Sequence, residues 1–535
     1  MNKTCALMVV MMIWPSVMAA DGAEGRAPGA GVPRTQAAGG SGAKAGDPVT
    51  ITDTPQGYLD ASIDNAKRRM TGKYTGDGWT WHACFTMNGF IDSYLATRDT
   101  AWLDAAVKYF DWNIGLLLTG PDGHQGWLGP VPGQAGRLGE HPIGDPIMMD
   151  PMVRFAAVVL KDEPALAGKY GRSARAYVAL ARKLMFEKWE ARGIWREDGP
   201  YGVFTGWPRY YTEQEPNRWQ PSLSGRESIT LPFNMQVHWG LVAARIHRIT
   251  GEKAWRDKSL RIFNFVKGRL VLYDEHYSWN YWEPFGPWDV DSNNSQAFRH
   301  WIGTHPYRDY QAGEIRAIVE AFHHGVTFDA QDMKRFVRTN IRVMWNGSLD
   351  DIQWNNSNAG VQKGAFGEIR LASKPAGIFN RYAGALWTDL VQFDPTARKI
   401  YEKQLTPGTY QHAYYYNVTR NREPSYERRH GDLPATAWDF PFSNNSTLSM
   451  VAAMPSAVER GKPTVLACQT RVEGDLTIEL RSEDGKGAIA TLREASPRRP
   501  GILNLTWDTK DTKPGRYRVR WTLKGEYRDF PIEVR

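Results

Sequence analysis

Apolar residues recur at intervals of three and four from about residue 55 to residue 450, which is the spacing of amphipathic helices. Two pairs of helices are clearest, and a turn with Thr, an acidic residue and Ala-Trp separates the members of each pair. The pairs are FTMNGFIDSYLA with AWLDAAVKYFDWNIGLLL, and MQVHWGLVAARIHRI with AWRDKSLRIFNFVKGRLVL. Weaker copies begin near Pro151, Glu314 and Gly377. Repeated hairpins of this size predict a solenoid or a closed ring of about a dozen helices.

After about Ala453 the pattern changes to an alternation of apolar and polar residues. Segments such as DLTIELRS, ILNLTWDT and GRYRVRWTLK lie between turns rich in Gly, Pro and Asp. This is the period of strands that bury one face. We expect residues 453–535 to form a small β-sandwich similar to the immunoglobulin-like modules of secreted enzymes.

The N-terminal residues have the pattern of an export signal. Lys3 precedes an apolar run that ends at the small residues Ala19 and Ala20, so residues 1–20 are expected to be a cleaved signal peptide. Residues 21–48 are rich in Gly, Ala and Pro and predict a flexible leader. No later segment is apolar enough to span a bilayer. The sequence therefore predicts a periplasmic or secreted protein without a membrane span.

The helical hairpins resemble a known architecture. Paired helices with turns of the type T-G-[DE]-x-A-W, together with long aromatic loops, are similar to the (α/α) toroids of polysaccharide lyases and six-hairpin glycosidases. The resemblance extends over roughly Thr54 to Leu448 and implies a toroid domain over residues 49–452. In such toroids the N-terminal ends of the inner helices and their preceding loops line a cleft. An open solenoid that binds proteins is the structural alternative.

One segment, residues 273–310, combines many large aromatic residues with histidines, carboxylates and amides but has no helical or strand periodicity. Long loops in compact chains are often functional, and flat aromatic faces beside hydrogen-bonding groups suit a sugar-binding cleft. The alternative is a loop that packs its aromatic side chains onto the body of the protein. The sugar contacts that we expect from this segment are Trp279, Trp282, Trp288, His300 and Arg308.

Charge favours an acidic glycan as the partner. The formal net charge is +8 with a pI near 9.1, and a diffuse positive field attracts anions. An exported protein with an aromatic cleft fits an acidic polysaccharide or oligosaccharide better than a nucleic acid.

No zinc motif or phosphate-binding loop is present, so neither a metal nor a cofactor is expected. Cys84 and Cys468 are interpreted as two small buried side chains rather than a disulfide.

Acidic polysaccharides can be cleaved by β-elimination, in which a base removes the C5 proton of a uronate, a polar group neutralises the carboxylate and an acid protonates the departing oxygen. Asn234 and His238 lie four residues apart near a predicted helix start, and therefore on one face. Alginate lyases of the toroid class are similar in carrying a catalytic Asn beside a His, although there the two residues are adjacent. The resemblance implies that Asn234 is the neutraliser and His238 the base, and a structural pair is the alternative.

Further candidates lie at other predicted helix starts. His300 and His305 precede the helix that begins near Tyr310, and His305 is the alternative base, with Tyr307 or Tyr310 as the acid. His82 with Trp81, and Arg218 with Trp219, are expected to position the substrate.

Two other function classes stay open at the level of sequence. Glycoside hydrolysis needs two carboxylates across the scissile bond, and Glu283, Asp289 and Asp291, or Asp145 and Asp150, are the candidates. A non-catalytic surface protein that binds glycans would share the aromatic cleft. It would not need histidine, tyrosine and asparagine together at helix starts. The sequence therefore favours an exported polysaccharide lyase, with a six-hairpin hydrolase as the first alternative.

Overall fold

The computed structural model describes residues 51, 53–70, 77–130, 136–198, 200–207, 209–221, 228–273, 275–289, 299–300, 308–354, 358, 387–404, 413–414, 417–418, 448–454, 457–470, 473–498 and 501–535. The predicted signal peptide and leader lie outside this part of the chain and stay predictions.

Eleven α-helices are found in the described residues between Pro55 and Gln404, as the apolar spacing predicts. They are α1 (Pro55–Met70), α2 (Asp77–Thr97), α3 (Ala101–Ile114), α4 (Gly144–Ala157), α5 (Ala167–Ala181), α6 (Lys188–Ala191), α7 (Phe233–Thr250), α8 (Lys253–Arg269), α9 (Arg308–His323), α10 (Ala330–Arg338) and α11 (Pro395–Gln404). Short π-helical turns extend three of them: η1 (Val158–Asp162), η3 (Arg182–Glu187) and η5 (Thr339–Met344). The 3-10 turns are η2 (Pro164–Leu166), η4 (Pro287–Asp289) and η7 (Thr388–Gln392).

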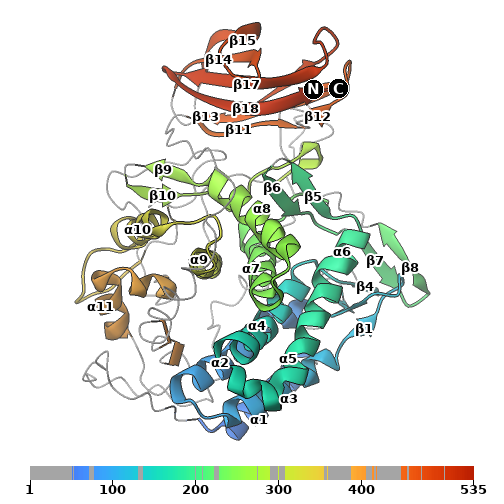
Figure 1. The fold of residues 1–535 in the computed structure, drawn as a ribbon, viewed down its shortest axis with the longest axis vertical. Helices are drawn as coiled ribbons and strands as arrows, with labels where there is room; N and C mark the ends of the chain where they lie inside the picture. Colours follow the sequence, from blue (N-terminus) through green and yellow to red (C-terminus); the bar gives the residue numbers. More distant parts are fainter. Residues whose placement is uncertain are drawn as a thin grey trace, which may run out of the picture.

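The helices pack in pairs of chain neighbours, which confirms the predicted hairpins. Helix α2 contacts α3, α4 contacts α5, α7 contacts α8, and α9 contacts α10. The first members of these pairs also contact one another in the order α2, α4, α7 and α9. These four inner helices lie together in the lower half of Figure 1, with α3, α5 and α8 around them. All residues of α4 are buried, charged ones included.

Two residues late in the chain contact the inner helices. The Asn417 Nδ2 donates to the carbonyl oxygen of Asp92 on α2 at 2.9 Å. The Tyr414 hydroxyl donates to Asp389 Oδ1 at 2.5 Å, and the guanidinium of Arg316 on α9 lies 5.5 Å from the Tyr414 ring centroid. Asn417 therefore contacts α2, and Tyr414 contacts α9. The residues that would complete the ring lie outside the described part, so the closed toroid stays a prediction.

Short strands lie in the loops between the helices. They are β1 (Leu118–Thr119), β2 (Gln125–Gly126), β3 (Gly129–Pro130), β4 (Arg137–Gly139), β5 (Trp195–Asp198), β6 (Tyr201–Phe204), β7 (Arg209–Thr212), β8 (Glu215–Pro221), β9 (Val271–Tyr273) and β10 (His276–Ser278). Strands β3, β4, β7 and β8 form a four-stranded sheet in that order, while β1–β2, β5–β6 and β9–β10 are hairpins. The four-stranded sheet extends from the side of the helical region near α6 (Figure 1).

The C-terminal region consists of β-sheets, as the alternating pattern predicts. Its strands are β11 (Leu448–Met454), β12 (Ala457–Val458), β13 (Pro463–Thr470), β14 (Gly474–Ser482), β15 (Ala488–Arg498), β16 (Gly501–Asp508), β17 (Gly515–Leu523) and β18 (Glu526–Val534). One sheet has the order β11-β13-β16 and the other β12-β18-β17-β14-β15. Leu466, Leu503 and Trp521 belong to one apolar core between them. The two sheets lie at one end of the molecule (Figure 1).

Cys84 and Cys468, the cysteines of the described residues, are free thiols. Cys84 lies on α2, and Cys468 is buried in the core between the C-terminal sheets. No helix in the described ranges is long and apolar enough to cross a membrane.

Candidate functional site

The N-terminal end of α7 contains a buried polar pair. Pro232 precedes the helix, and the Phe233 backbone N–H donates to the Tyr281 carbonyl oxygen at 3.4 Å, which attaches the aromatic loop to this helix start. Asn234 is 3% exposed, and neither its amide nitrogen nor its amide oxygen has a hydrogen-bond partner in the described part of the chain. The same is true of His238 Nδ1, one turn later. Buried polar groups without partners are rare in native proteins, and each requires an explanation.

The ring of His238 is half-buried, so its accessible part lies away from the buried Nδ1. Burial lowers the pKa of His238 to about 4. The carboxylate of Asp150 opposes this effect, while the guanidinium groups of Arg316 and Arg245 add to it. The imidazole is therefore neutral at neutral pH, which is the protonation state that a general base needs.

Four inner helices converge at His238. The Cys84 thiol on α2 has its pKa raised to about 12 by burial and by Asp150 on α4, with Arg316 on α9 acting in the opposite direction. Asp150 and Arg316 are the same two groups that act on His238 of α7. Asp150 also accepts a hydrogen bond from Arg245. The Asn234 and His238 pair therefore lies at one end of a charged centre that the packing of four helices creates.

Tyr310, the predicted acid, lies in the first turn of α9 beside two other aromatic rings. Its ring centroid is 6.0 Å from that of Trp81 on α2 and 6.2 Å from that of Tyr281, with an angle of 22° between the two tyrosine planes. The Tyr281 ring centroid is 6.0 Å from that of His300. Tyr281 is thus in contact with both the α7 start, through its carbonyl group, and Tyr310.

His82 lies next to Trp81, at the start of α2. Its Nδ1 is 3.4 Å from Arg69 Nη1, and its ring centroid is 6.3 Å from that of Trp79. Burial, together with the positive charge of Arg69, lowers the pKa of His82 to about 4. The structure thus places Trp81 at the site and gives His82 a contact with α1.

Two of the predicted sugar contacts are core residues. Trp279 is 1% exposed and its Nε1 donates to Glu314 Oε2 at 2.8 Å. Trp282 is 0% exposed and its Nε1 donates to the Thr230 carbonyl oxygen at 2.6 Å. These rings hold the loop against the helices, which is the packing alternative for this segment, and they present no face to a substrate. Trp288 is half-buried and its Nε1 donates to Thr230 Oγ1 at 3.2 Å.

Arg218 and Trp219 lie on β8, in the four-stranded sheet. Arg218 is exposed, whereas Trp219 is half-buried with its ring centroid 5.3 Å from that of Tyr211 and 5.2 Å from the guanidinium of Arg192. No described contact joins these two residues to Asn234 or His238. His305, Tyr307 and Asp291 lie outside the described residues, as does the side chain of Arg308, so their predicted roles stay predictions.

The candidate carboxylates of a hydrolase are engaged in structural contacts. Asp289 accepts hydrogen bonds from the Thr230 backbone N–H and hydroxyl and from the Phe285 and Gly286 backbone N–H groups, while burial raises its pKa to about 6. Asp145 lies 2.8 Å from Lys188 Nζ and accepts from Trp189 Nε1 at 2.5 Å, and burial raises its pKa to about 6.

Glu283 Oε1 accepts a hydrogen bond from Asn280 Nδ2 at 2.6 Å, and Asp150 is paired with Arg245. All four carboxylates are buried. Each therefore already has a partner in the protein that explains why it is there.

Several groups at the site were not predicted. Tyr281, Arg245 and Arg316 belong to it, and Asn88, Asp92 and Arg154 form the adjoining polar centre. The signal was present in the sequence as polar residues within apolar helices, for example the Asn and Asp of FTMNGFIDSYLA. No group of side chains suited to hold a metal ion is found among the described residues.

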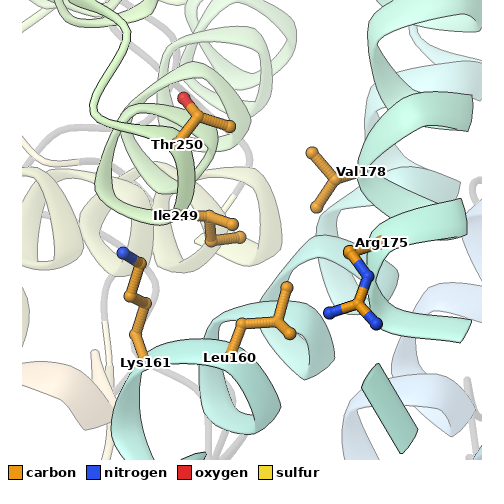
Figure 2. Close-up of a pocket in the computed structure, with 6 residues that line it drawn as sticks. All are labelled: Leu160, Lys161, Arg175, Val178, Ile249 and Thr250. Atoms are coloured by element: carbon orange, nitrogen blue, oxygen red, sulfur yellow. The ribbon is translucent and has the colours of Figure 1, made fainter. Parts of the chain in front are cut away.

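A separate pocket of about 340 Å³ lies at the other end of α7, where η1 and α5 approach it. Figure 2 shows its lining residues, which are Leu160, Lys161, Arg175, Val178, Ile249 and Thr250. None of the predicted site residues is among them.

Comparison with known proteins gives little further information. No protein-family model and no curated protein matches the chain. Among solved structures, a glycoside hydrolase of family 76, a mannosidase from Bacteroides thetaiotaomicron, is similar with a TM-score of 0.34 and 13% identity, over 61% of this chain and 71% of that chain. A likeness at this level assigns neither a family nor an activity.

Proposed function

We propose that the protein is an exported carbohydrate-active enzyme that cleaves a uronic-acid-containing glycan by β-elimination. The observation that supports the proposal most directly is the polar pair at the start of α7: a buried Asn234 amide without hydrogen-bond partners among the described residues, one helical turn from the neutral imidazole of His238. An amide that can both donate and accept suits a substrate carboxyl group.

Each step of the elimination has a group in this region. Asn234 binds the uronate carboxyl group and stabilises the negative charge that develops when the C5 proton leaves. His238 accepts that proton, and the electron pair of the C5–H bond forms the C4=C5 double bond as the C4–O glycosidic bond breaks. Tyr310 donates a proton to the departing oxygen. His305 as base and Tyr307 as acid are alternatives that lie outside the described residues.

The charge of the chain supports an anionic substrate. Its formal net charge is +8, and a diffuse positive field attracts anions. Near His238 the guanidinium groups of Arg245 and Arg316 are accompanied by the carboxylate of Asp150, which is paired with Arg245. The engagement of Asp145, Asp150, Glu283 and Asp289 in protein contacts makes a two-carboxylate hydrolysis the weaker alternative.

The deciding experiment is to incubate the mature protein with a panel of acidic and neutral polysaccharides. Ultraviolet absorbance and the concentration of reducing ends are both measured over time. Elimination produces an unsaturated uronate that absorbs in the ultraviolet, together with one new reducing end per cut. Reducing ends without absorbance would overturn the proposal in favour of hydrolysis. Binding without any cleavage would indicate a glycan-binding protein.

The roles within the site are tested by two substitutions. Asn234→Ala is expected to lower kcat by about a hundredfold to a thousandfold, which is the usual effect of removing one preorganised donor from a developing oxyanion. His238→Ala is expected to abolish turnover while glycan binding persists. The matched control is His247→Ala at the far end of α7, where the ring hydrogen-bonds to the Glu252 carbonyl oxygen. An Asn234→Ala protein with full activity would remove Asn234 from the mechanism.

A further inference from the structure

An accessible aromatic row extends from the candidate site and is composed of Trp81, Phe85, Tyr281, His300 and Tyr310. The rings of Trp81, Tyr310, Tyr281 and His300 succeed one another with centroid distances of 6.0, 6.2 and 6.0 Å. These four side chains are half-buried, so each keeps part of its surface accessible.

Phe85 extends the row along α2. It lies one helical turn after Trp81 and therefore on the same face of the helix. It is 57% exposed, whereas Phe90, Ile91 and Tyr94 later in α2 are buried. A large apolar side chain that stays exposed on an inner helix does not gain the free energy that burial would give.

The aromatic row is continuous with the polar pair. Tyr281 accepts a hydrogen bond at its carbonyl oxygen from the Phe233 N–H, directly before Asn234. Cys84, next to Phe85 in the chain, is influenced by the same Asp150 and Arg316 that act on His238. The row therefore includes side chains of the aromatic loop, α9 and α2, and Tyr281 connects it to the helix start that carries Asn234.

We infer that the aromatic row binds consecutive sugar residues of a glycan chain, so that the protein recognises a chain several residues long rather than a disaccharide. Flat rings present apolar faces to the C–H faces of pyranose sugars, while the hydroxyl groups at the sugar edges stay hydrated. The inference rests on the proposed function for the choice of a glycan as the ligand, but the binding of a chain can be measured without turnover.

The test is the affinity of the full protein for size-graded oligosaccharides, from disaccharides to octasaccharides, measured by calorimetry. Oligogalacturonates and oligoalginates are the acidic probes, and xylo-oligosaccharides and manno-oligosaccharides are the neutral ones. Affinity is expected to rise over several sugar residues and then level off. Trp81→Ala and Phe85→Ala are each expected to weaken binding of the longest good ligand about tenfold, while disaccharide binding changes less.

Tyr527→Ala is the matched control, because Tyr527 is an aromatic residue with 54% exposure on β18 of the C-terminal sheets. A loss of affinity that is the same in Phe85→Ala and Tyr527→Ala would overturn the inference. So would an affinity independent of chain length, or no binding of any probe. Chain-length-dependent binding of neutral probes alone would support the aromatic row but contradict the proposed elimination. This outcome distinguishes a failure of the proposed function from a failure of the inference about the aromatic row.

Discussion

At the scale of single residues, the surroundings of His238 determine the pKa of its ring. Its ring lies among Asp150, Arg245 and Arg316, and burial is the largest influence on its pKa. A histidine in water is half-protonated near pH 6.5, whereas this one is neutral down to about pH 4.

We therefore predict that kcat/KM depends on a group with a pKa of about 4. The catalytic base is neutral above this pH, so kcat/KM stays level from neutral pH down to about pH 5 and falls roughly tenfold per pH unit below about pH 4. The measurement is a pH profile of kcat/KM on the substrate found with the panel. An inflection near pH 6.5 would mean that a solvated histidine, rather than His238, is the base.

The Cys84 thiol offers a second prediction at this scale. Burial beside Asp150 raises its pKa to about 12, so hardly any thiolate exists at pH 8 and alkylation should be slow. Iodoacetamide labelling followed by mass spectrometry is expected to leave Cys84 unmodified in the native protein and to modify it in urea. Rapid labelling of the folded protein would contradict the raised pKa of the Cys84 thiol.

At the scale of elements, one carboxylate organises the loop before the site. Asp289 in η4 accepts four hydrogen bonds, two from Thr230 and two from the backbone at Phe285 and Gly286. It thereby joins the aromatic loop to the segment that leads into α7. The burial of Trp279 and Trp282 strengthens the same connection.

We predict that Asp289→Asn lowers the free energy of unfolding by about 2–4 kcal/mol, because an amide NH₂ group replaces one acceptor oxygen and leaves buried donors without partners. Urea unfolding measures the change. The matched control is Asp484→Asn, in an exposed turn of the C-terminal sheets, which should leave stability nearly unchanged. An equally stable Asp289→Asn protein would show that these four hydrogen bonds do not hold the loop.

At the scale of the whole molecule, buried charges join the inner helices. Arg154 on α4 donates to Asn88 Oδ1 at 2.9 Å and to Asp92 on α2, and Arg316 on α9 donates to the same Asn88 oxygen at 2.9 Å. The side chains of Arg154 and Asp92 are 5% and 4% exposed. A buried pair of this kind fixes the relative position of two helices, but removing one partner leaves an uncompensated charge.

We predict that Arg154→Met destabilises the protein by about 3–5 kcal/mol and that adding Asp92→Leu recovers much of the loss, because the second change removes the isolated carboxylate. Thermal and urea unfolding of the single and double variants test this. As a control, Arg182→Met removes a partly exposed pair with Glu252, whose contribution should be below about 1 kcal/mol. If the double variant is no more stable than Arg154→Met alone, the pair is not the cause.

The sequence alone predicted the longer helices, their order and the C-terminal strands, whereas it did not predict the short strands β1–β10 in the loops between the helices. Apolar spacing defines α2, α3, α7 and α8 because each helix must bury one face, and the change to alternation after residue 453 gives the C-terminal strands because a strand buries every second residue. The spacing of Asn234 and His238 likewise fixed their position on one helical face.

Only the tertiary structure decided which side chains meet. Tyr281 and Arg316 join the site although they are far from Asn234 in the sequence, and no local pattern encodes such contacts. The same is true of burial: Trp279, Trp282 and Tyr281 are neighbours in one aromatic segment, yet two of them are core residues and the third stays accessible. The packing of the loop against α7 and α9 determines that difference, because a side chain's exposure depends on every element that surrounds it.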